Sequence, residues 1–128
     1  MSHHFDVTVY YEDTDMGGIV YHANYLKFIE RARSNWVRGL GLDQNALRGS
    51  GTIFAVRRIE ADFVSPARLD DVLDITTEVL DSTGVRIRLR QDVRRGAKTL
   101  FRAEVELVAI DRKTGGVQRL PKSLRDAL

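Results

Sequence analysis

The sequence predicts an α+β fold, in which one long central helix is wrapped by a curved antiparallel sheet of about five strands. Residues 22–40 repeat apolar side chains at three- and four-residue steps, which is the period of an amphipathic helix. Beyond residue 52 the apolar residues mostly alternate with polar ones, which is typical of strands. Tight glycine turns between the later strands favour antiparallel pairing. The apolar stripe of a single helix needs a cover, and the sheet is the available partner.

The first strand is expected at residues 5–11, where the sequence FDVTVYY alternates and is rich in valine and tyrosine. The helix is expected from His22 to about Leu40, with Gly39 and Gly41 as stop signals. Its apolar stripe is formed by Leu26, Ile29, Ala32, Trp36 and Leu40, flanked by Tyr25, Phe28 and Val37.

The remaining elements follow in order along the chain. A short helical piece is expected at residues 43–49, and a short terminal helix within the last nine residues. Strands are expected at residues 52–67, 72–82, 84–95 and 99–111. In the third of these, Val85, Ile87 and Leu89 fall on one face and Arg86, Arg88 and Arg90 on the other. The arginine row is expected on the exposed face or paired with Glu104 and Glu106.

Composition narrows the class of protein. The chain has 128 residues, of which 43% are hydrophobic, and this predicts a single domain over residues 1–128 with a real core. It has no long apolar run and no signal-peptide pattern, so we expect neither a membrane span nor secretion. The absence of cysteine excludes disulfides, thiolate metal sites and cysteine nucleophiles, and it is consistent with a cytoplasmic location. A net charge of +2 without a concentrated basic stripe argues against a nucleic-acid partner.

The segment YYEDTDMGGIVYHANY, residues 10–25, concentrates the chemistry of the chain. It places Glu12, Asp13, Asp15, Gly17 and Gly18 between the first strand and the long helix. Glycines permit unusual backbone angles or the close approach of another molecule. A helix N-terminus carries free N–H groups and a partial positive charge, which would keep a neighbouring aspartate ionised and could hold an oxyanion. Spacing alone leaves open whether Asp15 caps the helix or acts as a reactive group.

Three segments, YYEDTDMGGIVYHANYLKFIERAR, FVSPARLDD and RLPKSLRD, closely resemble the hotdog-fold acyl-CoA thioesterases of the 4-hydroxybenzoyl-CoA thioesterase type. The sequence is most similar to the subfamily associated with the bacterial Tol–Pal cell-envelope system. The resemblance spans nearly the whole chain, and its first segment is the most specific. It implies hydrolysis of the thioester between an acyl group and coenzyme A or a related carrier, with no cofactor.

The resemblance also implies roles for single residues. Asp15 aligns with the catalytic aspartate, which either attacks the thioester carbon or activates water. The backbone N–H at or near His22 would polarise the carbonyl, while the His22 side chain could protonate the leaving thiolate or orient water. Gly17 and Gly18 would let the thioester approach, and Tyr25 could bond near the substrate or form part of the core.

Alternatives remain open at these positions. Asp13 has the same strand parity as Asp15, but we expect it to bond turn amides. Glu30, on the polar helix face, is the second choice for a catalytic acid, and no ligand set for a metal is expected around His22. Arg57 and Arg58, with Arg94, Arg95 and Lys98, could meet the phosphates of coenzyme A or simply line a solvated sheet face.

The partners expected are an acyl-CoA, possibly an acyl carrier protein, and a second copy of the chain. An open sheet has edges that invite pairing, so a homodimer with a continuous sheet, or a homotetramer built as a dimer of dimers, is expected. Two other functions remain open. One is a hydratase or dehydratase acting on acyl thioesters, and the other is a non-catalytic protein that binds an acyl carrier protein.

Overall fold

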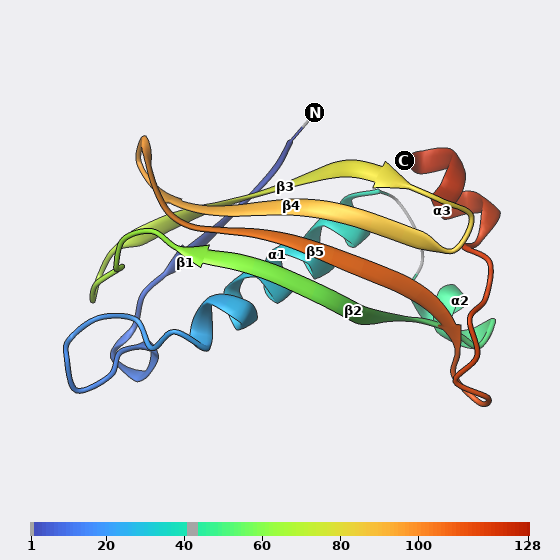
Figure 1. Cartoon of the computed structure of the whole chain (residues 1–128), viewed down its shortest axis with the longest axis horizontal. Helices are drawn as coiled ribbons and strands as arrows, with labels where there is room; N and C mark the ends of the chain where they lie inside the picture. Colours follow the sequence, from blue (N-terminus) through green and yellow to red (C-terminus); the bar gives the residue numbers. More distant parts are fainter. Residues whose placement is uncertain (1, 41–43) are drawn as a thin grey trace.

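The computed structural model describes residues 2–40 and 44–128 and shows one sheet curved around one long helix (Figure 1). The elements follow the order β1 (His3–Thr8), a 3₁₀ turn (Tyr11–Asp13), α1 (Asn24–Gly39), α2 (Gln44–Gly49), β2 (Thr52–Phe63), β3 (Val72–Ser82), β4 (Arg86–Arg95), β5 (Lys98–Asp111) and α3 (Lys122–Ala127). The strands pair antiparallel in the order β1-β3-β4-β5-β2. The α+β prediction is confirmed.

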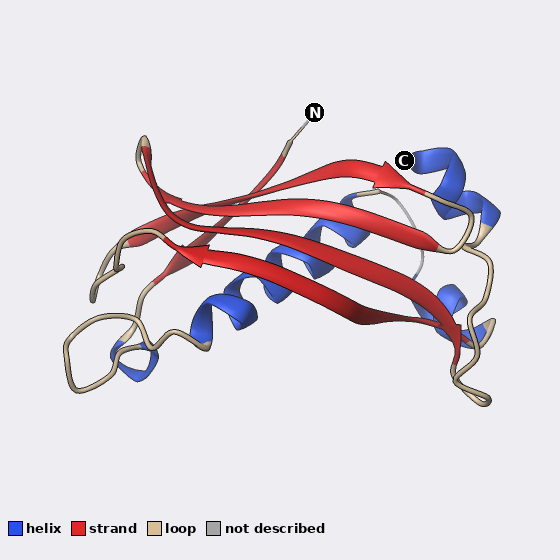
Figure 2. Cartoon of the chain, in the orientation of Figure 1, coloured by secondary structure: helices blue, strands red, loops and turns tan. Residues whose placement is uncertain are grey.

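The sheet leaves two strands at its edges, and they differ greatly in length. β1 has six residues and pairs only with β3, whereas β2 has twelve residues and pairs only with β5. Figure 2 shows the long strands crossing over α1, while α2 and α3 lie near the end of the sheet that is remote from the start of α1. β2 therefore offers the longer unpaired edge.

The core lies between α1 and the sheet face that it covers. Phe28, Ile29 and Ala32 of α1 are fully buried, as are the inward side chains of the central strands, which include Leu73, Ile75, Leu89, Val93, Phe101 and Val105. Burial of such large apolar side chains contributes roughly 1.5–3 kcal/mol each. Hydrophobic packing of this one helix against this one sheet therefore supplies most of the stability.

Buried polar side chains, Gln91 and Thr77, also lie inside this apolar layer. Gln91 of β4 is fully buried, and its amide nitrogen donates to the backbone carbonyl of Ile29 and to the Thr77 hydroxyl, both at 2.9 Å. Its amide oxygen accepts a hydrogen bond from the Arg33 guanidinium at 3.0 Å. Because these bonds join the middle of the sheet to the middle of α1, they fix where the helix lies along the strands.

The opposite face of the sheet is charged and pairs its charges across strands. Arg88 of β4 contacts Asp81 of β3 at 2.7 Å and Glu104 of β5 at 3.4 Å. The predicted alternation of β4 is confirmed, because Ile87 and Leu89 are buried and Arg86 and Arg88 are exposed.

Some boundaries differ from the prediction. The first strand ends at Thr8, because residues 11–13 turn into a 3₁₀ helix instead of continuing the strand. Leu26, which we expected in the buried stripe, is 41% exposed, and the neighbouring Tyr25 is buried in its place. The predicted stop signal at Gly41 and the predicted start of the short helix at Asp43 lie outside the described residues.

Replacing Gln91 tests its role at the centre of the fold. Gln91→Leu removes three hydrogen bonds and leaves the Thr77 hydroxyl and the Arg33 guanidinium without their buried partner. We expect the free energy of unfolding to fall by about 2–3 kcal/mol, measured by urea denaturation. Glu104→Gln, on the exposed face, is the control and should change it by less than about 0.5 kcal/mol. Equal midpoints for the two variants would contradict the role given to Gln91.

Candidate active site

Residues 13–21 form a small antiparallel loop ahead of α1. The backbone N–H of Tyr21 donates to the carbonyl of Asp13, and Thr14 bridges Val20. At the tip, the N–H of Asp15 donates to the carbonyl of Ile19 at 2.9 Å. These contacts define the site loop, residues 13–21, and they place Asp15 where the two arms of the loop separate.

Asp15 is exposed and lines an open hollow of about 690 Å³. Its neighbours around the hollow include Tyr11, Met16 and Leu69. One carboxylate oxygen accepts a hydrogen bond from the N–H of Gly17 at 2.8 Å, and the other accepts none from the residues that the structure describes.

Both predicted glycines shape this turn, in different ways. Gly18 has φ +78°, a left-handed conformation that other residues adopt only with strain. At Gly17 an added Cβ would lie 3.1 Å from the Asp15 carboxylate oxygen, so a side chain there would press on the acid. The expectation that glycine permits an unusual backbone angle is confirmed at Gly18.

Asp13 does a different task from Asp15. It is buried, and its carboxylate accepts a hydrogen bond from the N–H of Tyr10 at 2.9 Å, as expected for an aspartate that bonds turn amides. Its carbonyl also accepts from the side-chain amide of Asn24, the first residue of α1. Of the two aspartates, Asp13 is therefore the one that bonds the start of the helix, through its backbone carbonyl. The alternative in which Asp15 caps the helix, which spacing alone left open, is not what the structure shows, since its carboxylate bonds Gly17 within the loop.

His22 lies just before α1 and is exposed. Its ring is 4.6 Å from the Tyr21 ring and 6.2 Å from that of Phe63, measured between centroids, so it sits near the end of β2. Within the described part of the chain, no acceptor is recorded for the backbone N–H of His22 or of Ala23. These two amides are therefore available to a ligand.

Tyr25 is 3% exposed, and its ring stacks on Phe101 with centroids 4.9 Å apart. Its hydroxyl oxygen accepts a hydrogen bond from the N–H of Ala67 at 3.0 Å. Burial raises the pKa of the Tyr25 hydroxyl above its ordinary value, although the bond from Ala67 opposes this. The side chain thus ties the start of α1 to the segment that follows β2.

That segment, residues 67–71, also holds the site loop. The N–H of Val20 donates to the carbonyl of Ala67 at 2.9 Å, and Ile19 bridges Arg68. Asp71 accepts hydrogen bonds from the N–H of Arg68 and from the Arg95 guanidinium, both at 2.8 Å. Burial raises the pKa of Asp71, but these two bonds and the positive charges of Arg95 and Arg68 together outweigh it and hold the pKa below its ordinary value.

The structure does not bring Arg57 and Arg58 to Asp15 in the same chain. Arg57 forms an ion pair with Glu106, and Arg58 lies 3.3 Å from Glu60. Both lie near the middle of β2, whereas the site loop lies beyond its C-terminal end (Figure 1). Each therefore already has an acidic neighbour.

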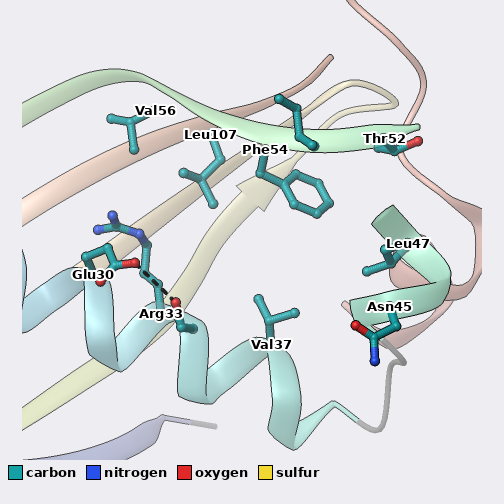
Figure 3. A pocket seen from close by; sticks show the side chains of 11 residues that line it. Glu30, Arg33, Val37, Asn45, Leu47, Thr52, Phe54, Val56 and Leu107 are labelled. Carbon is teal, nitrogen blue, oxygen red and sulfur yellow. Dashed lines mark hydrogen bonds between the residues drawn. The ribbon is translucent and has the colours of Figure 1, made fainter. Parts of the chain in front are cut away.

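A second hollow, of about 590 Å³, opens between the later part of α1, α2 and the first half of β2 (Figure 3). Val37, Phe54 and Leu107 give it apolar walls, and Glu30 and Arg33 add charges. Burial lowers the pKa of the Arg33 guanidinium, and the charge of Glu30 opposes that effect. Glu30, the second choice for a catalytic acid, thus lies in a different hollow from Asp15.

Comparison with known proteins agrees with this architecture. The family model for the thioesterase-like superfamily matches residues 9–128. The chain belongs to the thioesterase-like superfamily. It is 42% identical to the acyl-CoA thioester hydrolase YbgC of Escherichia coli O6:H1, over 92% of this chain and 89% of that protein. It is 39% identical to the acyl-CoA thioesterase YbgC of Haemophilus influenzae, over 96% and 91%.

Solved structures confirm the hotdog arrangement of this thioesterase-like chain. A probable thioesterase of Bartonella henselae superposes with a TM-score of 0.84 at 38% identity, over 94% of this chain and 98% of that one. A hypothetical protein of Aquifex aeolicus superposes with a TM-score of 0.91 at 21% identity, over 98% of each chain, and shows the shared fold alone. Among the described helices, none is both long and apolar enough to cross a membrane.

Sequence reasoning missed two residues around the candidate site of this superfamily member, Asn24 and Asp71, and it considered Arg95 only as a phosphate contact or a solvated residue. Asn24 bonds Asp13, while Asp71 and Arg95 meet across the fold. A buried asparagine at the start of the helix could have been suspected, because short polar side chains often bond turn backbone at such positions. The pairing of Asp71 with Arg95 has no local signal, since it depends on how β3 and β4 lie in the sheet.

Tyr25→Phe tests the tie between α1 and residue 67. Removing the hydroxyl leaves the buried N–H of Ala67 without its acceptor, so we expect the free energy of unfolding to fall by about 1–3 kcal/mol at pH 7. Because the folded-state pKa of Tyr25 is raised, the wild type is stabilised by the neutral hydroxyl below the unfolded pKa and loses this contribution as the pH rises through the folded value. The difference between the two proteins should therefore shrink above about pH 10. Urea denaturation at pH 7 and pH 10.5 measures it, and a difference that grew with pH would contradict the assignment.

Proposed function

We propose that residues 1–128 form one catalytic domain that hydrolyses the thioester of an acyl-CoA, with Asp15 as the reactive acid. The observation that carries this is the exposed Asp15 carboxylate in a hollow, one oxygen held by Gly17 and the other accepting no hydrogen bond from the described residues. The relatives named YbgC, called acyl-CoA thioesterases or thioester hydrolases, support the same reaction. An acyl group on an acyl carrier protein presents the same thioester chemistry and is the alternative substrate.

The reaction needs a group that attacks and a place for negative charge. In one route Asp15 takes a proton from water and the hydroxide adds to the carbonyl carbon. The tetrahedral intermediate then expels the thiolate, which takes the proton from Asp15 and leaves as the thiol. In the other, Asp15 attacks the carbon itself, expels the thiolate and forms a mixed anhydride that water then hydrolyses. Both routes use the same carboxylate.

The free backbone N–H of His22 is our candidate for the oxyanion donor. Such a donor contributes about 100- to 1,000-fold in rate when it points at the developing oxyanion. The exposed His22 ring can protonate the leaving thiolate or orient water beside Phe63. Gly17 and Gly18, which carry no side chain, leave the approach to Asp15 open.

The substrate contacts predicted for Tyr25, Arg57 and Arg58 stay predictions, and the structure limits how each could act. The hydroxyl of Tyr25 is engaged by Ala67, so we propose that Tyr25 acts by placing the start of α1. Arg57 and Arg58 can meet the phosphates of coenzyme A only by sharing or exchanging Glu106 and Glu60.

We also propose that two copies pair along β2. This edge is long, and its exposed apolar side chains include Val56 at 46% and Phe63 at 56%. Antiparallel pairing would make one continuous sheet and cover them. It would also bring the first half of β2 in one copy near the His22 end of β2 in the other.

The central test is Asp15→Asn, which keeps the shape of the side chain and removes its basicity. We expect kcat/KM for acyl-CoA hydrolysis to fall by at least about 100-fold, measured by release of the free thiol. Glu12→Gln is the matched control, since Glu12 is an exposed acid three residues away in the same region, and it should stay within about twofold.

Full thiol release by Asp15→Asn would overturn the assignment. A screen with saturated and aromatic acyl-CoAs, and with one acyl carrier protein substrate, identifies the preferred thioester. Hydration of an enoyl-CoA without thiol release would favour the hydratase alternative.

Val56→Lys tests pairing along β2. A charge on an edge strand opposes edge-to-edge association, so we expect the dimer dissociation constant to rise at least about tenfold, measured by analytical ultracentrifugation. Val72→Lys is the control because Val72 is 58% exposed at the start of β3, away from this edge. Equal dissociation constants for the two variants would place the interface elsewhere.

A further inference from the structure

The segment of residues 67–71 is the support on which the site loop rests. The carbonyl of Ala67 accepts a hydrogen bond from the N–H of Val20, and Arg68 forms an antiparallel β-bridge with Ile19 in the same part of the loop. Leu69 of the segment forms part of the wall of the Asp15 hollow. Any displacement of this segment would therefore move both the backbone and the wall around Asp15.

The segment contains no helix or strand, and its own backbone contributes one turn hydrogen bond, from the N–H of Asp71 to the carbonyl of Arg68 at 3.1 Å. Asp70 has φ +70°, the one left-handed conformation recorded for a non-glycine residue in residues 2–40 and 44–128. Such strain persists only where surrounding contacts determine the backbone. Two backbone hydrogen bonds with Val9 supply part of this support. The N–H of Asp70 donates to the carbonyl of Val9 at 3.0 Å, and the N–H of Val9 donates to the carbonyl of Asp71 at 2.9 Å.

The Asp71 carboxylate adds two side-chain hydrogen bonds to this support, beside the bond of the Tyr25 hydroxyl to Ala67. One of its oxygens accepts the N–H of Arg68, which closes the segment on itself, and the same oxygen accepts the guanidinium of Arg95. Arg95 is the last residue of β4, a central strand. The Asp71 side chain is 20% exposed and that of Arg95 36%, so water screens this pair less than the more exposed pair of Arg88 and Asp81.

We propose that Asp71 and Arg95 are positioning residues for the reaction at Asp15: their ion pair locks residues 67–71 to the end of β4, and the locked segment holds the site loop in its reactive shape. The catalytic consequence rests on the function proposed for Asp15. The structural consequence, an ordered site loop, does not depend on it.

The test compares Asp71→Asn and Arg95→Met with Asp81→Asn in the full chain. Asp81 is the matched control because it pairs with Arg88 at 2.7 Å on the charged face, away from the site loop. We expect kcat for acyl-CoA hydrolysis to fall about 10- to 100-fold in the first two variants, since a small displacement of a catalytic group is costly. KM should change by less than about threefold, because neither side chain contacts the bound thioester in this proposal. Asp81→Asn should stay within about twofold.

Hydrogen exchange gives a readout that is independent of activity. In Asp71→Asn the amide of Val20 should exchange at least about tenfold faster than in the wild type, while that of Leu89 in β4 should keep its rate. Arg95→Lys retains the charge and should restore most of the kcat lost in Arg95→Met. If Asp71→Asn does not fold, the two Arg95 variants carry the comparison.

Three results would overturn the proposal. They are an unchanged kcat in both Arg95→Met and Asp71→Asn, an unchanged Val20 exchange rate, or equal acceleration at Val20 and Leu89, which would indicate a general loss of stability. If Asp15→Asn retained full hydrolysis while Val20 exchange still rose in Asp71→Asn, the catalytic assignment would fail and the support of the loop would stand.

Discussion

The packing of α1 into the concave face of one sheet is the constraint on which the rest of this structure depends. A single helix with a wide apolar stripe can bury that stripe only if the sheet curves around it, and the fully buried Phe28 and Ile29 show that it does. Gln91 adds direction to this otherwise non-directional contact, because its amide bonds both Ile29 and Arg33 from inside the sheet. The position of the helix along the strands determines where its N-terminal end, and therefore His22, meets the end of β2.

The two neighbouring acids, Asp13 and Asp15, divide structure and chemistry between them. Asp13 is buried and its carboxylate accepts the hydrogen bond of the Tyr10 N–H, so it is committed to the fold. Asp15 faces the hollow and is held by a single amide, so it remains accessible. The loop that carries Asp15 buries Val20 in the core and is also held by hydrogen bonds to residues 67–71. Rigidity at the site thus comes from segments far away in the sequence.

The charged face of the sheet explains why a basic chain shows so few free cations there. Arg57 and Arg88 each lie beside a carboxylate, and Arg90 and Arg102 both approach Asp92 at 3.5 Å. Cross-strand rows of opposite charge stabilise an exposed sheet face modestly and discourage its association with apolar surfaces. The apolar edge at Val56 and Phe63 is therefore the more suitable surface for a second copy.

The sequence by itself determined the element types, their order and the α+β class, because helical and strand periodicities are local properties of the chain. β3 was predicted with its observed bounds, Val72–Ser82, and the long helix within about two residues at its start. The sequence also singled out Asp15, Gly17, Gly18 and His22, since they stand close together in one segment. Only the tertiary structure decided that Asp13 and not Asp15 contacts the start of the helix, that Tyr25 is committed to Ala67, and that Asp71 meets Arg95. Those contacts depend on strand order and curvature, which bring together residues that no local pattern relates.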